Sequence, residues 1–384
     1  MKAVISRVFS RALTSTSRRN LLRGWYAIKR RSLQRPAIVH YFHQDDDPYS
    51  QLLATLMPVL QERYHIELRC HRVTPPDDAS APDRERLREW STRDVAKLAT
   101  AYRLKPDLEL VQKLPWHTTD PNIGASLRQK LGHYLGATMY FEGEWYWGID
   151  RLHYLERRLR DAGLARRLLT SSLIEPLPLR FETLEHRATT QPTLEFFCSL
   201  RSPYTYLAVD RVARLARHYG ADLQLRFVLP MVMRGLPVGF SKRKYILLDT
   251  KREADRLGLP FGSVVDPVGN PVENGLAILH RAIALGLGTE FLSSFLSGAF
   301  AEGIDTHRRS ALLQLALRAG LSKSDFEDAL KDSAWRTMAT ANREVLLASG
   351  LWGVPSFRVV GYPSVWGQDR LWMIEQDLLT ATRS

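Results

Sequence analysis

The chain has 384 residues, of which 45% are hydrophobic and 25% are charged, a composition typical of two or three folded domains rather than of a disordered protein. Its net charge is +13, but ten cations precede the first acidic residue, Asp45, so only +3 remains for the rest of the chain. This distribution argues against a nucleic-acid-binding domain, and no apolar run is long enough for a membrane-spanning helix.

Residues 1–36 form a basic, Arg- and Ser-rich tail that contains no acidic residue. Such a tail can attract an anionic membrane surface or nucleic acid irrespective of sequence, and it also resembles a transit peptide. A solvated or loosely helical extension is an equally good interpretation. Because Cys70 and Cys198 are isolated and fit a reducing compartment, we expect a cytoplasmic protein, with a peripheral membrane or organelle location through the basic N-terminus as the alternative.

Apolar spacing and turn residues predict a series of elements between residues 37 and 170. Asp47 and Pro48 are typical of a capped helix start, and Pro58 should kink the helix that follows. The predicted elements are a strand (38–43), a helix from 48, a strand (66–73), helices (83–102 and 123–135), two strands around a turn at 143, and a final helix from 150.

The second half of the chain repeats this order after a proline-containing linker, with more helical material before the closing strands. The predicted elements are a strand (194–198), a helix (204–219), a strand (223–228), helices near 241–257, 272–286, 288–301, 306–319, 322–332 and 334–349, two strands (356–360 and a short one ending at 366), and a helix from about 370 to 379.

Residues 38–75 align with residues 193–230 at a constant offset of 155 without a gap. A second shared stretch joins residues 147–152 to residues 366–371. Nine pairs in the first alignment are identical: Phe42/Phe197, Pro48/Pro203, Tyr49/Tyr204, Leu52/Leu207, Leu60/Leu215, Tyr64/Tyr219, Leu68/Leu223, Val73/Val228 and Pro75/Pro230. The period is too long for a solenoid, so the repeat predicts two domains of one kind.

Strand, helix, strand, inserted helices, a hairpin and a final helix are the elements of the thioredoxin fold. We therefore predict an α/β protein with two thioredoxin-like domains in tandem, each with a helical insertion that is longer in the C-terminal copy. The predicted parts are the tail (1–36), a degenerate thioredoxin-like domain (37–170), a linker (171–192) and a thioredoxin-like domain (193–384) whose insertion spans about 231–350.

Redox proteins of this fold place a cysteine pair at the start of the first helix, where this chain has Ser202-Pro203-Tyr204-Thr205. A hydroxyl cannot cycle through a disulfide, so dithiol chemistry is excluded at this position. Cys70 and Cys198 lie singly in apolar runs and are expected to be buried thiols. A helix start still favours an anion, and a serine there can donate a hydrogen bond to a thiolate supplied by another molecule.

Several motifs of the C-terminal copy resemble 2-hydroxychromene-2-carboxylate isomerases and kappa-class glutathione transferases over roughly residues 193–380. The motifs are Glu195-Phe196-Phe197-Cys198-Ser199-Leu200-Arg201-Ser202-Pro203-Tyr204-Thr205-Tyr206-Leu207-Ala208, Lys242-Arg243-Lys244-Tyr245, Gly353-Val354-Pro355-Ser356-Phe357 and Trp366-Gly367-Gln368-Asp369-Arg370-Leu371. The resemblance implies glutathione as co-substrate and no metal.

The same resemblance implies a role for each matched position. Ser202 would hydrogen-bond the glutathione sulfur, Pro355 would be cis, and the backbone of Val354 would pair with the cysteinyl part of glutathione. Asp369 would bind the γ-glutamyl ammonium with help from Gln368. Because both copies contain Asp-Arg at this place, Asp369 as a cap of the last helix is an equally good interpretation.

The substrate side departs from the isomerase pattern. In the isomerases a lysine follows the second strand and faces the substrate, but no lysine lies between residues 229 and 241. Arg234, Lys242 and Tyr204 are the nearest candidates for a contact with a small electrophile. The isomerase reaction is thus less well supported than activation of a thiol.

The first copy has lost the residues that carry this chemistry. Asp47 replaces Ser202, where a carboxylate would repel a thiolate, and Thr138 is placed opposite Pro355. This domain is therefore expected to be structural, within an intrachain pseudo-dimer or a homodimer. His40, His43 and the aspartates from Asp45 to Asp47 suggest a metal site, but a polar turn explains them better because neighbouring strand residues face opposite sides.

Two functions follow from these observations. The first is a glutathione-dependent isomerase or transferase in which Ser202 stabilises the thiolate for addition to an electrophilic small molecule. The alternative is a non-catalytic thioredoxin-fold adaptor or membrane-surface protein with a vestigial site.

Overall fold

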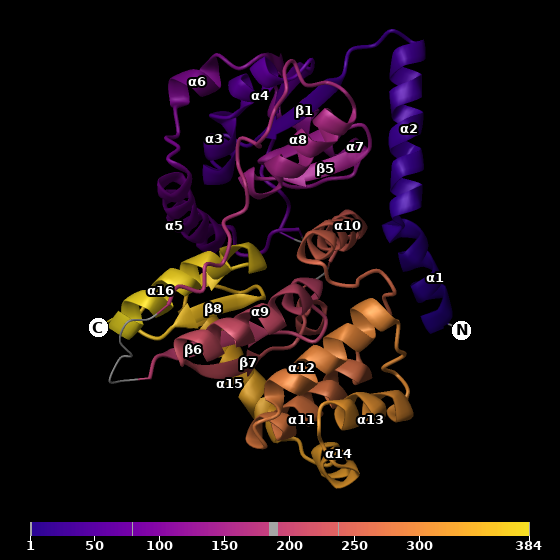
Figure 1. The fold of residues 1–384 in the computed structure, drawn as a ribbon, viewed down its shortest axis with the longest axis vertical. Helices are drawn as coiled ribbons and strands as arrows, with labels where there is room; N and C mark the ends of the chain where they lie inside the picture. The colour runs from indigo at the N-terminus through magenta and orange to yellow at the C-terminus, as the bar shows by residue number, and fades with distance from the viewer. Residues whose placement is uncertain (1, 79, 184–190, 237, 384) are drawn as a thin grey trace. The chain divides into compact units, whose positions relative to one another are not determined.

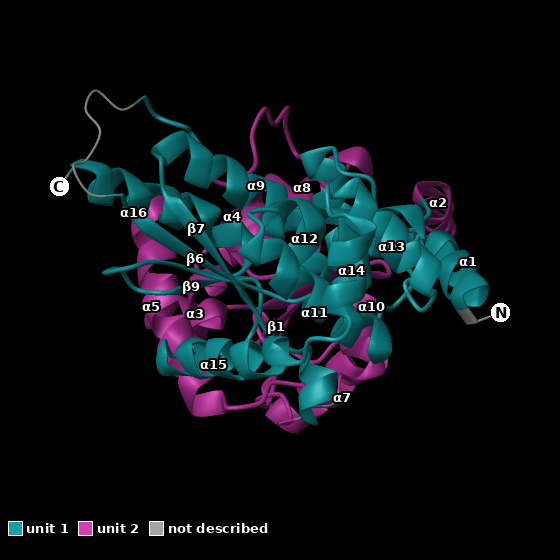
Figure 2. Cartoon of the chain, turned by 90° about the horizontal axis from the view of Figure 1, so that it is seen from below, with its two compact units in different colours: residues 1–15, 178–237, 246–384 teal, residues 16–177, 238–245 magenta. Residues whose placement is uncertain are grey.

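The computed structural model describes residues 2–78, 80–183, 191–236 and 238–383 (Figure 1). These residues form two compact units (Figure 2). Unit 1 comprises residues 1–15, 178–237 and 246–384, and unit 2 comprises residues 16–177 and 238–245. Part of the predicted linker, residues 184–190, lies outside the described residues, and the predicted domain boundaries remain a prediction.

Unit 1 is built on a four-stranded sheet of order β7-β6-β8-β9. Its central strand β6 pairs in parallel with β7 and antiparallel with β8, and β8 pairs antiparallel with β9. Helix α9 packs against β6 and β7, and α16 packs against α9 and β8. The elements are β6 (Thr193–Cys198), α9 (Pro203–Tyr219), β7 (Asp222–Phe227), β8 (Ser356–Val359), β9 (Val365–Trp366) and α16 (Leu371–Arg383).

The helical insertion follows β7 and has the six helices that the apolar spacing predicts. Its apolar core includes the fully buried rings of Phe291 and Phe295. Helix α14 begins with a capping box between Ser322 and Asp325. The helices are α10 (Phe240–Leu257), α11 (Asn270–Ala284), α12 (Gly288–Ser297), α13 (Arg309–Arg318), α14 (Lys323–Ala329) and α15 (Ala334–Ala348).

Unit 2 contains a five-stranded sheet of order β3-β2-β1-β4-β5. The predicted helix from Pro48 is two short helices: α3 ends at Ala54, α4 begins at Met57, and Pro58 is the second residue of α4, where its missing N–H breaks no helical hydrogen bond. Strand β3 and helix α6 had no apolar pattern long enough to predict them. The elements are β1 (Ile38–His43), α3 (Pro48–Ala54), α4 (Met57–Arg63), β2 (Glu67–Arg72), α5 (Arg84–Tyr102), α6 (Leu108–Gln112), β3 (Trp116–Thr118), α7 (Pro121–Leu131), β4 (Thr138–Phe141), β5 (Glu144–Trp147) and α8 (Leu152–Asp161).

The two units share more than their sheet order. In unit 2, the Tyr64 hydroxyl donates to the buried Glu156 carboxylate at 3.0 Å, and Glu156 also accepts the Leu173 N–H. In unit 1, the Tyr219 hydroxyl donates to the buried Glu375 carboxylate at 2.9 Å, and Glu375 accepts the N–H groups of residues 180 and 181. Each unit thus uses one buried tyrosine–glutamate pair to hold the chain segment beside its last helix.

The basic tail is helical. Helix α1 (Lys2–Thr14) belongs to unit 1, where the Ser6 and Ser10 hydroxyls donate to the Val264 carbonyl. Helix α2 (Thr16–Ser32) belongs to unit 2. Among the described residues, no helix is long and apolar enough to cross a bilayer.

Candidate functional site around Ser202

Ser202 is the N-cap of α9. Its backbone is extended, Pro203 takes the first helical position, and its Oγ accepts the Thr205 N–H at 3.2 Å. The Ser202 hydroxyl lies 3.4 Å from the Val354 carbonyl, to which it donates. The sequence thus places a part-exposed hydroxyl at the positive end of a 17-residue helix, beside the loop that precedes β8.

The Val354–Pro355 peptide bond beside Ser202 is cis. The preceding Gly353 lies directly against the indole of Trp366, because a Cβ added at Gly353 would be 2.1 Å from that ring. The Pro355 carbonyl accepts the Gly367 N–H at 2.9 Å. Close packing on one side and a backbone hydrogen bond on the other therefore fix this loop against Ser202.

Two buried hydroxyls close to the helix start lack hydrogen-bond partners. Thr205, at the fourth position of the Ser-Pro-Tyr-Thr motif, is completely buried, and its Oγ1 has no partner. Ser199 is 2% exposed, and its Oγ also has none. Burying a hydroxyl without a hydrogen-bond partner costs about 1–3 kcal/mol, so neither hydroxyl stabilises this end of α9.

Gln368 and Asp369 follow β9 and lie in a partly buried charged cluster. The Gln368 carbonyl oxygen Oε1 accepts from Arg211 at 2.6 Å, and its Nε2 donates to Glu253 at 3.1 Å and to Asp369 at 2.6 Å. Gln368 is 1% exposed and is fully engaged with these protein groups, whereas Asp369 is half-buried. The short helical turns that contain Asp369 and Asp150 begin after Gly367 and Gly148, which have no side chain to act as a cap.

Arg211 is a member of this cluster that the sequence did not single out. Burial, helped by the neighbouring Arg256, lowers the Arg211 pKa to about 10, although Asp369 and Glu253 oppose the shift. The sequence contains only a weak indication that Arg211 belongs to the site. Arg211 is one of several cations on α9, and only the fold shows that it reaches Gln368.

The three substrate-side candidates lie in different surroundings. The Tyr204 hydroxyl donates to the buried Asp249 carboxylate at 2.8 Å. Arg234 donates to the Trp352 carbonyl at 3.3 Å, and burial lowers its pKa. Both side chains therefore support other parts of unit 1. Tyr204 holds α10, and Arg234 holds the loop that precedes Gly353.

Lys242 belongs to the stretch of α10 that clusters with unit 2. Its Nζ donates to the Ser80 carbonyl at 2.8 Å. Burial lowers the Lys242 pKa to about 8, and Asp77 partly opposes this shift. A half-buried lysine with such a pKa can exchange a proton near neutral pH.

The chain's own sulfur cannot supply a nucleophile. Cys70 and Cys198 are both free and buried. Burial raises the Cys70 pKa to about 12 and raises that of Cys198 even further. Any thiolate at Ser202 must therefore come from another molecule.

The structure corrects one alignment in the first copy. The sequence comparison placed Thr138 opposite Pro355, but the sheet register differs by one residue. Thr138 pairs with Phe42, whereas Ser356 pairs with Phe197, the counterpart of Phe42. Thr138 is therefore the counterpart of Ser356.

Ala137 takes the place of Pro355 in unit 2. The Gly148 N–H donates to the Ala137 carbonyl just as the Gly367 N–H donates to the Pro355 carbonyl. The sequence comparison missed this because the β4–β5 hairpin is one residue shorter than the β8–β9 hairpin. Unit 2, where the structure describes it, has no cis peptide bond.

Internal hydrogen bonds occupy the corresponding position of unit 2. Asp47 caps α3 by accepting the Tyr49 and Ser50 N–H groups. The Ser50 hydroxyl donates to Asp47 at 2.7 Å and accepts the N–H groups of Ala137 at 2.8 Å and Gln44 at 3.1 Å. Burial raises the Asp47 pKa to about 6, so a carboxylate is present at neutral pH where unit 1 offers a hydroxyl.

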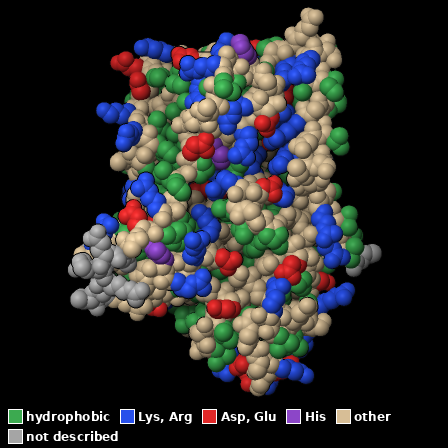
Figure 3. Space-filling view, in the orientation of Figure 1, with side chains coloured by type: hydrophobic (Ala, Val, Ile, Leu, Met, Phe, Trp, Pro, Cys, Tyr) green, Lys and Arg blue, Asp and Glu red, His purple; other side chains and the backbone are tan. Residues whose placement is uncertain are grey.

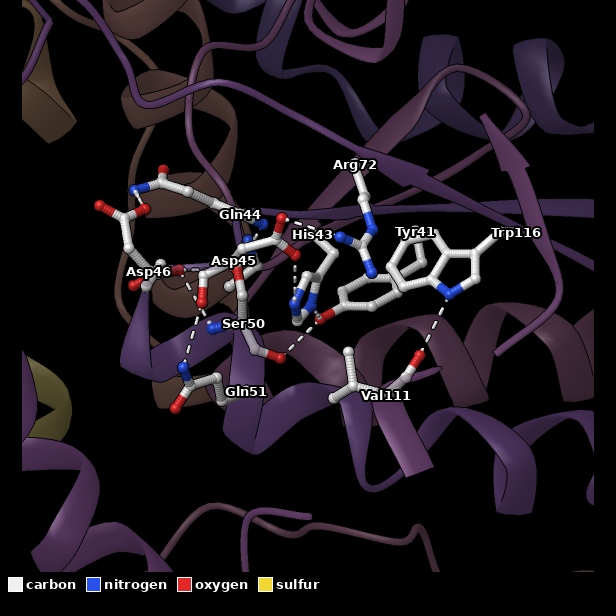
Figure 4. Close-up of polar contacts among 12 residues, drawn as sticks. Tyr41, His43, Gln44, Asp45, Asp46, Ser50, Gln51, Arg72, Val111 and Trp116 are labelled. Carbon is white, nitrogen blue, oxygen red and sulfur yellow. Dashed lines mark hydrogen bonds and ion pairs between the residues drawn. The ribbon is translucent and has the colours of Figure 1, made fainter. Parts of the chain in front are cut away.

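Figure 4 shows polar contacts of residues just before and at the start of α3, among them His43, Asp45 and Ser50. His43 lies between the Tyr41 hydroxyl, 2.9 Å from its Nδ1, and the Asp45 carboxylate, 3.5 Å from its Nε2. Arg72 pairs with Asp45 at 3.2 Å and stacks over the Trp116 ring. Apart from the buried Arg72 Nε, which has no hydrogen-bond partner, these polar groups contact one another, as expected for a polar turn.

Unit 2 also contains three buried histidines and one part-buried histidine, here called the buried histidine group, and burial is the main cause of the lowered pKa of each. The members, with their pKa values, are His40 (about 4), His43 (about 4), His71 (about 3) and His133 (about 3). His40 and His71 are 3.0 Å apart through their ring nitrogens. No cluster of three or more histidine, cysteine or acidic side chains suited to a metal occurs in the described part of the chain.

Unit 1 therefore has a thioredoxin-like arrangement in which the start of the first helix carries a serine. Residues 193–379 match the family described as DSBA-like thioredoxin domain. This part of the chain therefore has a mixed α/β, thioredoxin-like fold, as the sequence predicted.

Two curated relatives are named 2-hydroxychromene-2-carboxylate isomerase. The chain is 22% identical over 191 residues to the protein from Pseudomonas sp. (strain C18), covering 47% of this chain and 88% of the relative. It is 25% identical over 190 residues to the one from Pseudomonas putida, covering 47% and 92%. The predicted resemblance to this family is thus confirmed.

One similar solved structure is that of a 2-hydroxychromene-2-carboxylate isomerase, which is 22% identical with a TM-score of 0.41. The match covers 49% of this chain and 95% of the isomerase. The cytosolic disulfide reductase DsbM from Pseudomonas aeruginosa is 25% identical with a TM-score of 0.40, covering 49% and 99%.

Proposed function

We propose that unit 1 is a glutathione-dependent isomerase or transferase in which Ser202 stabilises the glutathione thiolate. The observation that carries the proposal is the position of the Ser202 hydroxyl, at the start of α9 and 3.4 Å from the carbonyl of the cis Val354–Pro355 bond. Free N–H groups and the helix dipole at this end favour an anion, and a neighbouring hydroxyl adds a charge-assisted hydrogen bond.

The backbone of Val354 offers a place for the cysteinyl part of glutathione. Its carbonyl accepts only the weak Ser202 hydrogen bond, and its N–H has no acceptor among the described residues. A peptide ligand can pair with both groups as an added strand does. The Ser202 hydroxyl then turns from the Val354 carbonyl to the incoming sulfur.

Asp369 is the proposed partner of the γ-glutamyl ammonium. Gln368, which accepts a hydrogen bond from Arg211, donates to this carboxylate, so Gln368 acts as a positioning residue rather than as a ligand contact. Arg211 partly offsets the charge of Asp369. We therefore assign the thiolate contact to Ser202 and only orientation of the peptide to Asp369.

The proposed reaction begins with addition of the thiolate to an electrophilic carbon of a small molecule. Loss of a leaving group from the adduct completes a conjugation, whereas rotation about a bond followed by release of the thiolate completes an isomerisation. The names of the curated relatives favour isomerisation. The absence of a lysine between residues 229 and 241 favours conjugation, since the proton-transfer group of the isomerases is missing.

We also infer that unit 2 is a second copy of the same fold that has lost its site. The shared strand order and the matching tyrosine–glutamate pairs support this inference. Asp47 and the hydrogen bonds of Ser50 account for the loss. A cytoplasmic location, where glutathione is abundant and thiols stay reduced, fits both units.

The test is calorimetric titration of the whole chain with glutathione. Loss of a hydrogen bond to a charged group costs about 1.5–3 kcal/mol, so Ser202→Ala should raise the Kd roughly 10- to 100-fold. Ser322→Ala is the matched control, because it removes the N-cap serine of α14 in the same unit. Equal affinity of wild type and Ser202→Ala would overturn the role of the serine, and no binding at all would favour the non-catalytic adaptor.

A further inference from the structure

The N-terminal helices α1 and α2 turn apolar side chains to solvent and polar side chains to protein, the reverse of an ordinary surface helix. In α2, the side chains of Leu21, Trp25 and Ile28 are 75%, 52% and 67% exposed. These residues share one face, since they are three and four positions apart. We call Leu21, Leu22, Trp25 and Ile28 the α2 apolar face.

The side of α2 that carries Arg23 and Arg30 faces protein instead of solvent. Arg23 forms a two-point ion pair with Glu144, with one contact at 2.7 Å, and Arg30 pairs with Glu142. The Arg30 side chain is only 10% exposed. Tyr26 lies on this same side, against Gly143. Two ion pairs thus orient the helix so that its apolar face is turned outward.

Helix α1 shows the same inversion within unit 1. Val4, Ile5, Val8 and Phe9 are each at least half exposed. The polar groups Ser6, Arg7, Ser10 and Arg11 donate to residues 263, 264 and 303 of unit 1. Two helices in two separate units therefore each bury polar side chains and expose apolar ones. Figure 3 shows hydrophobic side chains along the edge where Figure 1 places α2.

We infer that these helices bind the surface of an anionic lipid bilayer. Apolar side chains on one helix face insert at the boundary of headgroups and acyl chains, and nearby cations add attraction to anionic lipid. The exposed Lys29 and Arg31 supply this charge, and no acidic residue precedes Asp45. The Lys29 ammonium lies 4.8 Å from the centre of the Trp25 ring, and tryptophan and lysine are the side chains that favour a membrane interface.

Charge complementarity favours lipid over a second copy of this chain. A second copy would bring the same cations against Lys29 and Arg31, and like charges at close range oppose association. A bilayer with anionic headgroups offers apolar depth and opposite charge together. This surface is separate from the Ser202 site, so the inference does not depend on the proposed enzyme function.

Flotation of the whole chain with lipid vesicles tests the inference. We expect binding to vesicles of phosphatidylcholine mixed with phosphatidylserine, and weaker binding to phosphatidylcholine alone. The variant Leu21→Ser/Trp25→Ser/Ile28→Ser should lower the partition coefficient roughly tenfold or more. The matched control, Leu108→Ser/Ile123→Ser/Leu168→Ser, removes three other exposed apolar side chains of unit 2 and should bind like wild type.

Charge is tested separately. Lys29→Glu/Arg31→Glu should weaken binding roughly fivefold or more for each cation, and added salt should remove this difference. Lys105→Glu/Lys130→Glu changes the net charge equally at exposed positions elsewhere and should have little effect. Glutathione titration should give the same Kd for all these variants, which separates this result from the proposed function.

Three results would overturn the inference. The first is no binding to either kind of vesicle. The second is binding that the control variants weaken as much as the test variants do. The third is a concentration-dependent dimer, seen by sedimentation velocity, that the triple serine variant abolishes while vesicle binding is absent. The third result would assign the α2 apolar face to a second copy.

Discussion

Replacing Gly353 by alanine should disturb the loop that carries the cis bond. The added Cβ would be 2.1 Å from Cζ2 and 2.4 Å from Cε2 of Trp366, both in a rigid ring. Trp366 is paired with Ser356 in the sheet and packs edge-on against Trp352, with ring centres 4.7 Å apart. The indole or the loop must therefore move by more than about 1 Å to restore ordinary contact.

Overpacking of this kind typically costs about 1–3 kcal/mol. We expect Gly353→Ala to lower the free energy of unfolding of unit 1 by that amount. Because the shift moves the Val354 backbone away from Ser202, the Kd for glutathione should rise as well. Denaturant unfolding and calorimetric titration measure the two effects.

Two further variants make this test specific. Gly239→Ala adds a Cβ with no atom within 4 Å and should leave stability and affinity unchanged. Gly353→Ala combined with Trp366→Leu should cost less than the sum of the two single changes, because the smaller side chain relieves the clash. If Gly353→Ala unfolds at the same denaturant concentration as wild type, the close approach of this loop to Trp366 is wrong.

Two other predictions concern titration and buried hydroxyls. Between about pH 6.5 and 4, the four histidines of the buried histidine group are neutral in the folded chain and protonated in the unfolded chain, whereas Asp47 is protonated in the folded chain below about pH 6 and ionised in the unfolded one. The unfolded chain therefore binds about three more protons. The free energy of unfolding should thus fall by about 4 kcal/mol for each unit that the pH falls near pH 5. His71→Phe should make this dependence of the unfolding free energy on pH shallower, and Asp47→Asn should make it steeper. Denaturant unfolding at several pH values measures both effects, and unchanged slopes would contradict the lowered histidine pKa values and the raised Asp47 pKa. Thr205→Val removes an unpartnered hydroxyl and should not destabilise unit 1, whereas Ser50→Ala breaks three hydrogen bonds and should destabilise unit 2 by about 1–3 kcal/mol. A thermal melt in which Thr205→Val loses as much stability as Ser50→Ala would refute this contrast.

Local signals in the sequence predicted most of the fold. Ser202 followed by Pro203 predicts a helix start and Gly220 its end, and both hold because capping depends on neighbouring residues alone. The six helices of the insertion follow from apolar spacing for the same reason. Strand β3 has only three residues, Trp116–Thr118, and such a short element carries no periodic pattern.

The surroundings of the site could be predicted only in part. Ser202 and Pro355 come together as the motifs implied, but the link from Arg211 to Gln368 joins residues 157 positions apart and depends on the packing of α9 against the end of the sheet. The pairing of Thr138 with Pro355 failed because hairpin length, which sets register, differs by one residue between the copies. The outward apolar face of α2 was also not predicted, since charge alone does not tell which side of a helix faces protein.

The most direct test of the central claim is the thiol pKa of bound glutathione, measured by the ultraviolet absorbance of the thiolate across a pH titration. Our account predicts that binding to the wild-type chain lowers this pKa by about one unit or more, and that Ser202→Ala reverses most of the shift while Ser322→Ala does not. A bound thiol that titrates like free glutathione, or a lowered pKa that Ser202→Ala leaves in place, would contradict it.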